Sequence, residues 1–142
     1  GTTQLQCVAA GRYITNGVYG QVISDMLQFG QSPASIGTAD WCSEEFAALR
    51  ERVDNMAEKY NAAVAFVNDQ KDDEFKDFAI RHLYEMAADC IMAILLINDA
   101  SKAPELFGKS ARVYTRYAAA EVEKHYDFVM SATAADIEDY RK

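Results

Sequence analysis

Two histidines and two glutamates stand at spacings that could support chemistry. Glu85 follows His82 by three residues, and Glu121 precedes His125 by four. Residues three or four apart share one face of a helix, so each histidine would have a carboxylate beside it. Imidazole and carboxylate groups bind metals and also act as general acids and bases. His82, Glu85, Glu121 and His125 are therefore the candidates for a metal or small-ligand site.

The order of these residues disfavours a metal centre. Helical bundles that hold two metal ions use Glu from two helices and Glu-x-x-His from two others. Here the order is reversed, His82-x-x-Glu85, and the preceding helix lacks an inward acidic pair. Histidines hydrogen-bonded at a helix interface explain the pattern more simply. We predict no catalytic, cofactor-binding or metal-binding residue in this chain, with a bundle enzyme built on these four residues as the alternative.

Other catalytic motifs are missing from the sequence. It contains neither a glycine-rich phosphate-binding loop nor a Gly-x-Ser-x-Gly turn, and the acidic segment 69–74 lacks the glycine of a calcium loop. Five tyrosines recur along the expected helices and are interpreted as core or rim residues rather than as a ligand-stacking site: Tyr60, Tyr84, Tyr114, Tyr117 and Tyr126.

Composition narrows the class of protein. The 142 residues are enough for one domain, and the formal net charge of -8 argues against binding to nucleic acids or anionic membranes. Cys7, Cys42 and Cys90 form no C-x-x-C pair, which fits a reducing, cytoplasmic location. The apolar run around Cys90 is too short to span a bilayer. The chain starts at Gly1 rather than Met, so we expect it to be trimmed from a longer protein.

Hydrophobic spacing predicts four helices and no strand. The first, Thr3–Phe29, is weakened by Gly11, Gly17 and Gly20, although small residues also allow close helix packing. A loop follows at 30–38. Ser43 is a candidate N-cap for the second helix, whose apolar residues alternate at spacings of three and four: Phe46, Leu49, Val53, Met56, Tyr60, Ala63 and Val67.

The third and fourth helices are expected from Asp72 or Asp73 to about Asn98 and from about Pro104 to Ser131. The third becomes apolar on nearly all sides toward its end. Residues expected inside are, in the third, Phe75, Phe78, Ala79, His82, Met86, Cys90, Ala93, Ile94 and Ile97, and, in the fourth, Phe107, Ala111, Tyr114, Ala118, Val122 and Val129. Thr133 and Asp136 could start a final turn. Short connections between long helices predict an all-α, antiparallel up-down-up-down bundle.

Several helix-face segments resemble the C-terminal accessory domain of bacterial acyl-CoA dehydrogenases. The resemblance covers about residues 46–128 and is carried by segments 60–64 (YNAAV), 81–87 (RHLYEMA), 109–114 (KSARVY) and 117–122 (YAAAEV). It implies FAD and a catalytic glutamate in an upstream core, and it places neither in this chain. Residues 37–40 (GTAD) are only superficially like the Gly-Thr turn near the end of that core.

The resemblance implies one domain over residues 1–142: residues 1–42 at the junction with the core, three long helices in 43–131, and a tail in 132–142. This domain would pack on the core or a subunit interface, with homo-oligomers an option. The intact protein would oxidise acyl-CoA to 2,3-enoyl-CoA. The rival hypothesis is a stand-alone helical module that binds another protein.

Overall fold

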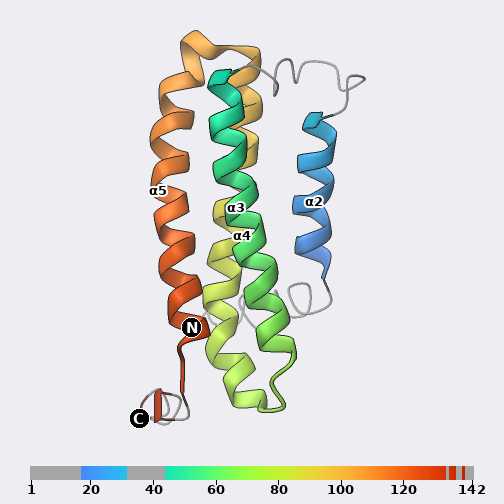
Figure 1. The fold of residues 1–142 in the computed structure, drawn as a ribbon, viewed down its shortest axis with the longest axis vertical. Helices are drawn as coiled ribbons and strands as arrows, with labels where there is room; N and C mark the ends of the chain where they lie inside the picture. Colours follow the sequence, from blue (N-terminus) through green and yellow to red (C-terminus); the bar gives the residue numbers. More distant parts are fainter. Residues whose placement is uncertain (1–16, 32–43, 134, 137–138, 140–142) are drawn as a thin grey trace, which may run out of the picture.

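The computed structural model describes residues 17–31, 44–133, 135, 136 and 139, and this part of the chain is a bundle of four long helices (Figure 1). They are α2 (Val18–Gln31), α3 (Glu44–Asn68), α4 (Asp73–Lys102) and α5 (Pro104–Met130). Successive helices run in opposite directions. The prediction of an all-α, up-down-up-down bundle is confirmed.

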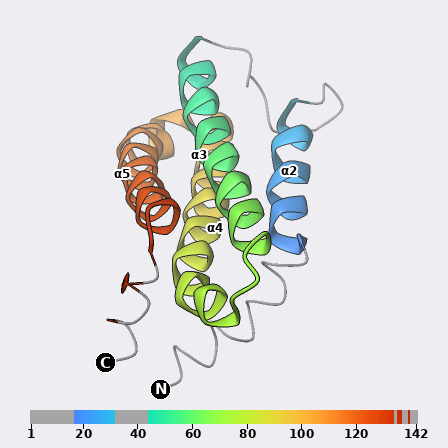
Figure 2. The same cartoon turned by 60° about the horizontal axis from the view of Figure 1, so that its bottom comes forward.

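α4 is the central helix of the described part. It contacts α2, α3 and α5, and α3 also contacts α2 and α5. α2 and α5 do not touch each other within the described residues. The bundle is therefore a three-helix core of α3, α4 and α5, with α2 packed against α3 and α4 on the side away from α5 (Figures 1 and 2).

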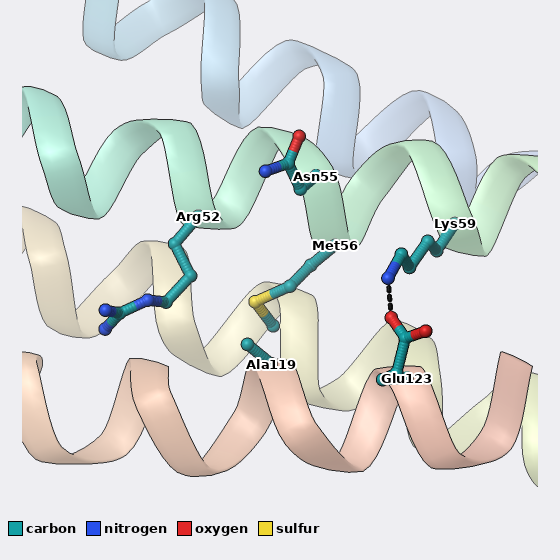
Figure 3. Close-up of a pocket in the computed structure, with 6 residues that line it drawn as sticks. All are labelled: Arg52, Asn55, Met56, Lys59, Ala119 and Glu123. Carbon is teal, nitrogen blue, oxygen red and sulfur yellow. Dashed lines mark ion pairs between the residues drawn. The ribbon is translucent and has the colours of Figure 1, made fainter.

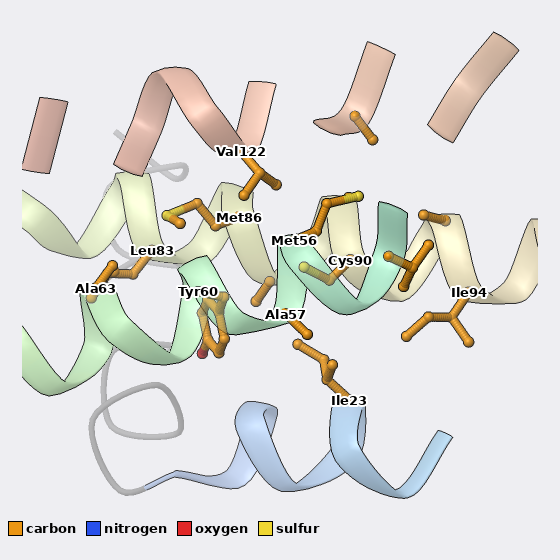
Figure 4. Close-up of a cluster of buried hydrophobic side chains, with 14 of the residues drawn as sticks. Ile23, Met56, Ala57, Tyr60, Ala63, Leu83, Met86, Cys90, Ile94 and Val122 are labelled. Carbon is orange, nitrogen blue, oxygen red and sulfur yellow. The ribbon is translucent and has the colours of Figure 1, made fainter. Parts of the chain in front are cut away.

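The apolar seam predicted for the second helix forms the α3 side of the core. All seven of its residues, from Phe46 to Val67, are buried, and Val53, Ala63 and Val67 are completely inaccessible. α4 supplies the opposite side with Leu83, Met86, Cys90, Ile94 and their neighbours (Figure 4). Alternate spacings of three and four keep a helix face on its partner, which is why this face was readable from sequence.

The burial of some residues differs from the prediction. Phe107, predicted inside α5, is 37% exposed. The apolar end of α4 was predicted to be buried on several sides, and α4 does contact three helices, but Met92 and Leu95 within it are 53% and 45% exposed. Among the described helices, α5 packs against α3 and α4 alone. Tyr114 is half-buried rather than buried.

The helix ends follow local chemistry. Asp72 caps α4, since its side chain accepts a hydrogen bond of 2.9 Å from the backbone N–H of Glu74. α4 continues to Lys102, beyond its predicted end at Asn98. The turn predicted at residues 101–104 therefore consists of Ala103 alone. Proline is tolerated at position 104, in the first turn of α5, because backbone N–H groups in that turn have no acceptor within the helix.

Two glycines shape the start of α2. Gly17 has φ +86, so the predicted continuous helix Thr3–Phe29 is wrong and the described helix begins at Val18. A Cβ on Gly20 would lie 3.2 Å from Oδ1 of Asn61 and 4.0 Å from Cε1 of Tyr60. Close packing of this glycine on α3 is therefore observed, as its small size suggested.

The remaining predictions concern the segments between and after the helices. Gly30 and Gln31, predicted as the start of the 30–38 loop, are instead the last residues of α2, and the rest of that loop lies outside the described residues, as do Ser43, Cys7, Cys42, Gly11 and most of the tail. Thr133 and Asp136 do form the predicted cap, since Oδ2 of Asp136 accepts from the N–H of Thr133 at 2.8 Å. Among the described helices, none is long and apolar enough to cross a membrane.

Candidate functional site

The two histidines meet at the interface between α4 and α5. Nδ1 of His82 and Nδ1 of His125 are 2.8 Å apart, a hydrogen-bond distance, and the ring centroids are 5.1 Å apart. We call His82 and His125 the histidine pair. His125 is 4% exposed, whereas His82 is half-buried. Because a hydrogen bond needs one donor and one acceptor, one of the facing nitrogens carries a proton and the other presents a lone pair.

Both glutamates predicted beside the histidines also come to the pair. Nε2 of His125 lies 2.8 Å from Oε2 of Glu85 and 3.8 Å from Oε2 of Glu121. Each carboxylate has a basic neighbour as well: Arg81 pairs with Glu85 at 3.4 Å and Lys124 with Glu121 at 2.8 Å. Nδ1 of His125 therefore connects α5 to α4 by a hydrogen bond, and Nε2 lies within ion-pair distance of Glu85 without making a hydrogen bond to any described residue.

Burial and the neighbouring charges both shift the pKa values of the histidine pair. Burial lowers the pKa of both rings, and the nearby His125 lowers that of His82 further. Glu85 raises the pKa of both rings, whereas Arg81 and Lys124 lower them. The net pKa shift is downward for both histidines. A neutral pair is thus favoured over a charged one.

Aromatic rings close one side of the histidine pair. The ring of His82 lies beside both Phe128 and Phe78, with centroids 4.5 Å and 6.2 Å away. The two phenylalanine rings stack on each other at 5.5 Å. Apolar walls of this kind limit the water available to stabilise an imidazolium, consistent with the lowered pKa of His82.

Asp89 is a further acidic residue near Glu85 and Glu121, and it was not predicted from the sequence. Burial, followed by the charges of Glu121 and Glu85, raises its pKa to about 6. Its position four residues after Glu85 puts it on the same face of α4, a signal that was available in the sequence.

The sequence also held a signal for the contact between the two histidines. His82 is 21 residues before Ala103 and His125 is 22 after it, and residues equidistant from the turn of an antiparallel hairpin lie side by side.

The four candidate residues converge, as the alternative of a bundle enzyme required, but they do not form a metal centre. In the described part of the chain, no group of three or more His, Cys, Asp or Glu side chains has an arrangement that could hold a metal ion. The facing nitrogens of the histidine pair bond to each other instead. That this chain lacks site residues altogether stays a prediction.

A shallow hollow lies on the other side of α5, between α5 and α3 (Figure 3). Its volume is about 190 Å³, and its lining includes Arg52, Lys59 and Glu123. Lys59 is ion-paired with Glu123, and Arg52 donates a hydrogen bond of 3.0 Å to Oγ1 of Thr115. Ligand pockets usually enclose about 300–1,000 Å³. The hollow is too small and too open for a flavin, and its charged side chains already have partners.

The tyrosines do not gather into a ligand site either. Tyr60 is buried, and its hydroxyl has no hydrogen-bond partner among the described residues. Tyr84 and Tyr117 are exposed, and Tyr114 and Tyr126 are half-buried. Core and rim positions agree with their interpretation from sequence, although the hydroxyl of Tyr60 lacks the expected polar partner. Cys90 is fully buried, and burial raises the pKa of its thiol to about 12, as for an inert core residue.

Comparisons with known proteins agree with the helix-face resemblance. The sequence model of the family described as "Acyl-CoA dehydrogenase C terminal" matches residues 15–137. A crystal structure of an acyl-CoA dehydrogenase family protein from Porphyromonas gingivalis is similar, with 34% identity and a TM-score of 0.73. That similarity covers 88% of this chain and 98% of the other. The search of curated proteins gave no match. The chain therefore belongs to the acyl-CoA dehydrogenase C-terminal family.

Proposed function

We propose that this chain is a non-catalytic accessory domain that packs on the catalytic core, or on a subunit interface, of an acyl-CoA dehydrogenase. The observation that carries the proposal is the family match over residues 15–137. The intact enzyme would bind FAD in its core, oxidise an acyl-CoA thioester to the 2,3-enoyl-CoA and work in the cytoplasm. In this proposal the domain's own part in the reaction is structural.

The outer surface of α5 supports a docking role. Leu106, Val113, Tyr117 and Phe128 are exposed at 70%, 62%, 59% and 47%. Their spacings of seven, four and eleven residues put them on one face of the helix, which we call the α5 outer stripe. Single exposed apolar residues are ordinary, but a row of them along one helix is typical of a surface that another protein covers. In this proposal the stripe faces the dehydrogenase core or a second subunit.

The test uses Val113→Glu, a charge placed in the middle of the α5 outer stripe. Because Val113 is exposed, the free energy of unfolding of this chain alone should change by no more than about 0.5 kcal/mol. In the whole gene product, the same change should lower the melting temperature, the retention of FAD and the acyl-CoA oxidation rate. Ala65→Glu at an exposed position of α3 is the matched control.

A whole Val113→Glu gene product with unaltered stability, FAD retention and activity would show that the α5 outer stripe is not the docking surface. If the gene product contains no dehydrogenase core at all, the accessory-domain proposal itself fails. The rival function, a stand-alone interaction module, would then be the one that the stripe supports.

A further inference from the structure

We propose that the histidine pair is an acid-sensitive switch: it joins α4 to α5 while at least one ring is neutral, and it releases them when both rings are protonated. The inference concerns contacts within this chain and holds whether or not the domain docks on a dehydrogenase core. It follows from the hydrogen bond between the two rings, their burial and their place in the hairpin.

Proton counting gives the first argument. With two neutral rings, one Nδ1 donates to the other; we assign the donor to His82, so that His125 accepts at Nδ1 and carries its proton on Nε2, 2.8 Å from Oε2 of Glu85. With one added proton, His125 becomes an imidazolium that donates from Nδ1 to His82 and from Nε2 toward Glu85, 2.8 Å away. A second added proton puts N–H groups on both facing nitrogens. At 2.8 Å, two N–H groups and two positive charges repel, so the contact cannot persist.

The surrounding charges affect the free-energy cost of adding the second proton to the histidine pair. The groups that act on the rings come from both helices: Arg81 and Glu85 from α4, and Glu121 and Lys124 from α5. Each carboxylate is also paired with one of these cations. The four charges sum to zero, so they hold no spare negative charge for a second imidazolium. α3 faces this end of the hairpin with apolar residues such as Ala63 and Val67.

The position in the fold turns a local contact into a conformational switch. The pair lies more than 20 residues from the Ala103 turn on both helices, close to where α4 begins and α5 ends. Near this open end the Phe78–Phe128 stack also joins the two helices. Loss of the pair would leave that stack to hold the end of α5 against α4, so the last turns of α5 would open more often without disturbing the Ala103 turn, and this opening is local rather than global.

The sign of the pH dependence follows from the pKa shifts. A histidine with a lowered pKa in the folded state contributes stability above its unfolded value of about 6.5. That stability is lost as the pH falls from about 7 through the folded pKa. Asp89 acts in the opposite sense, because its pKa is raised to about 6 in the fold. Comparing two chains that both keep Asp89 cancels its contribution.

The experiment compares the unaltered chain with His82→Gln by amide hydrogen exchange at about pH 7.5 and about pH 5. The glutamine amide can donate to Nδ1 of neutral His125 or accept from it when that ring is protonated, but it cannot take up a proton. In the unaltered chain, protection at the end of α5 and the start of α4 should fall several-fold more on acidification than it does in His82→Gln. Tyr84→Gln, an exposed change on the same helix, should behave like the unaltered chain.

A second measurement keeps the proposal testable if His82→Gln does not fold. Nitrogen-15 chemical shifts of the imidazoles in the unaltered chain should show opposite tautomers at neutral pH. Uptake of the second proton should lie below the ordinary histidine range and coincide with the loss of protection. Two rings that titrate independently near the ordinary value, with protection unchanged, would overturn the proposal. An equal acid-induced loss in His82→Gln and the unaltered chain would overturn it as well.

Discussion

At the scale of single residues, burial separates side chains that the sequence makes look alike. Met86 and Met92 lie six residues apart on α4, in a stretch whose one charged residue is Asp89. Met86 is completely buried and Met92 is 53% exposed. The same side chain therefore fills the core at one position and covers the surface at the other.

We expect Met86→Ala to lower the free energy of unfolding by about 2–5 kcal/mol, because it removes core contacts and leaves a cavity. Met92→Ala, made in the same helix, should change it by no more than about 0.5 kcal/mol. Urea denaturation of the two variants gives both numbers. A cost for Met92→Ala as large as that for Met86→Ala would mean that the exposed strip of α4 is in fact covered in solution.

Asp89 should make this domain less stable at neutral pH. Its pKa is raised to about 6, so its stabilising protonated form is fully present below about pH 3.8 and is lost as the pH rises through about 6. Asp89→Asn should therefore raise the free energy of unfolding at about pH 7.5, by an order of 1–2 kcal/mol once solvent screening is allowed for. At about pH 4 the gain should vanish. A gain that is equal at both pH values would contradict this reading.

The sequence predicted the separate neighbours of each histidine but not the pair itself. His82–Glu85 and Glu121–His125 follow from the helical period, which is a local property. The contact of His82 with His125 depends on the register of α4 against α5, and that register was fixed only by locating the turn at Ala103 rather than at 101–104. The raised pKa of Asp89 depends on the same long-range packing.

At the scale of helices, the start of α4 was predictable because capping is local, whereas its end lies at Lys102 rather than at the predicted Asn98. Asp72 accepts from the N–H of Glu74, and the sequence placed a cap at Asp72 or Asp73. Asp72→Ala should cost about 1 kcal/mol of unfolding free energy, since the backbone N–H loses its acceptor. Asp77→Ala, which removes the same charge from an exposed position inside α4, should cost clearly less. Equal costs would mean that charge, and not capping, matters here.

Gly20 governs how closely α2 approaches α3. Alanine is favoured over glycine within a helix by about 1 kcal/mol, but its Cβ would lie 3.2 Å from Oδ1 of Asn61. Asn61 is exposed and can move aside, so Gly20→Ala should be neutral or stabilising by up to about 1 kcal/mol. Gly20→Leu should destabilise, because the larger side chain pushes α2 away. Thermal denaturation distinguishes the two, and a strongly destabilised Gly20→Ala would show that Asn61 cannot yield.

The interior of the bundle was more predictable than its outside. The alternating seam of α3, from Phe46 to Val67, was identified completely because one helix face meets one set of partners. Phe107 was predicted inside but is exposed, and Met92 and Leu95 are exposed at the apolar end of α4, because an apolar side chain does not reveal whether the surface it needs lies in the same domain. These exposed apolar residues are compatible with a domain part of whose apolar surface is covered by another domain or subunit.

At the scale of the whole molecule, the central claim is that this chain carries no active site and serves a dehydrogenase core. The family match over residues 15–137 supports the link to a dehydrogenase, and the four convergent residues at the α4–α5 interface are the structural reason to test for a site. In the proposed account these residues hold two helices together and act on no substrate.

The most direct measurement compares flavin binding and acyl-CoA oxidation by this chain with those of the whole gene product, after both are incubated with FAD. The account predicts that only the whole gene product retains flavin and oxidises acyl-CoA, while this chain remains folded and inactive. Binding of flavin or acyl-CoA by this chain alone would contradict it, and His82, Glu85, Glu121 and His125 would then be the first residues to examine as a site.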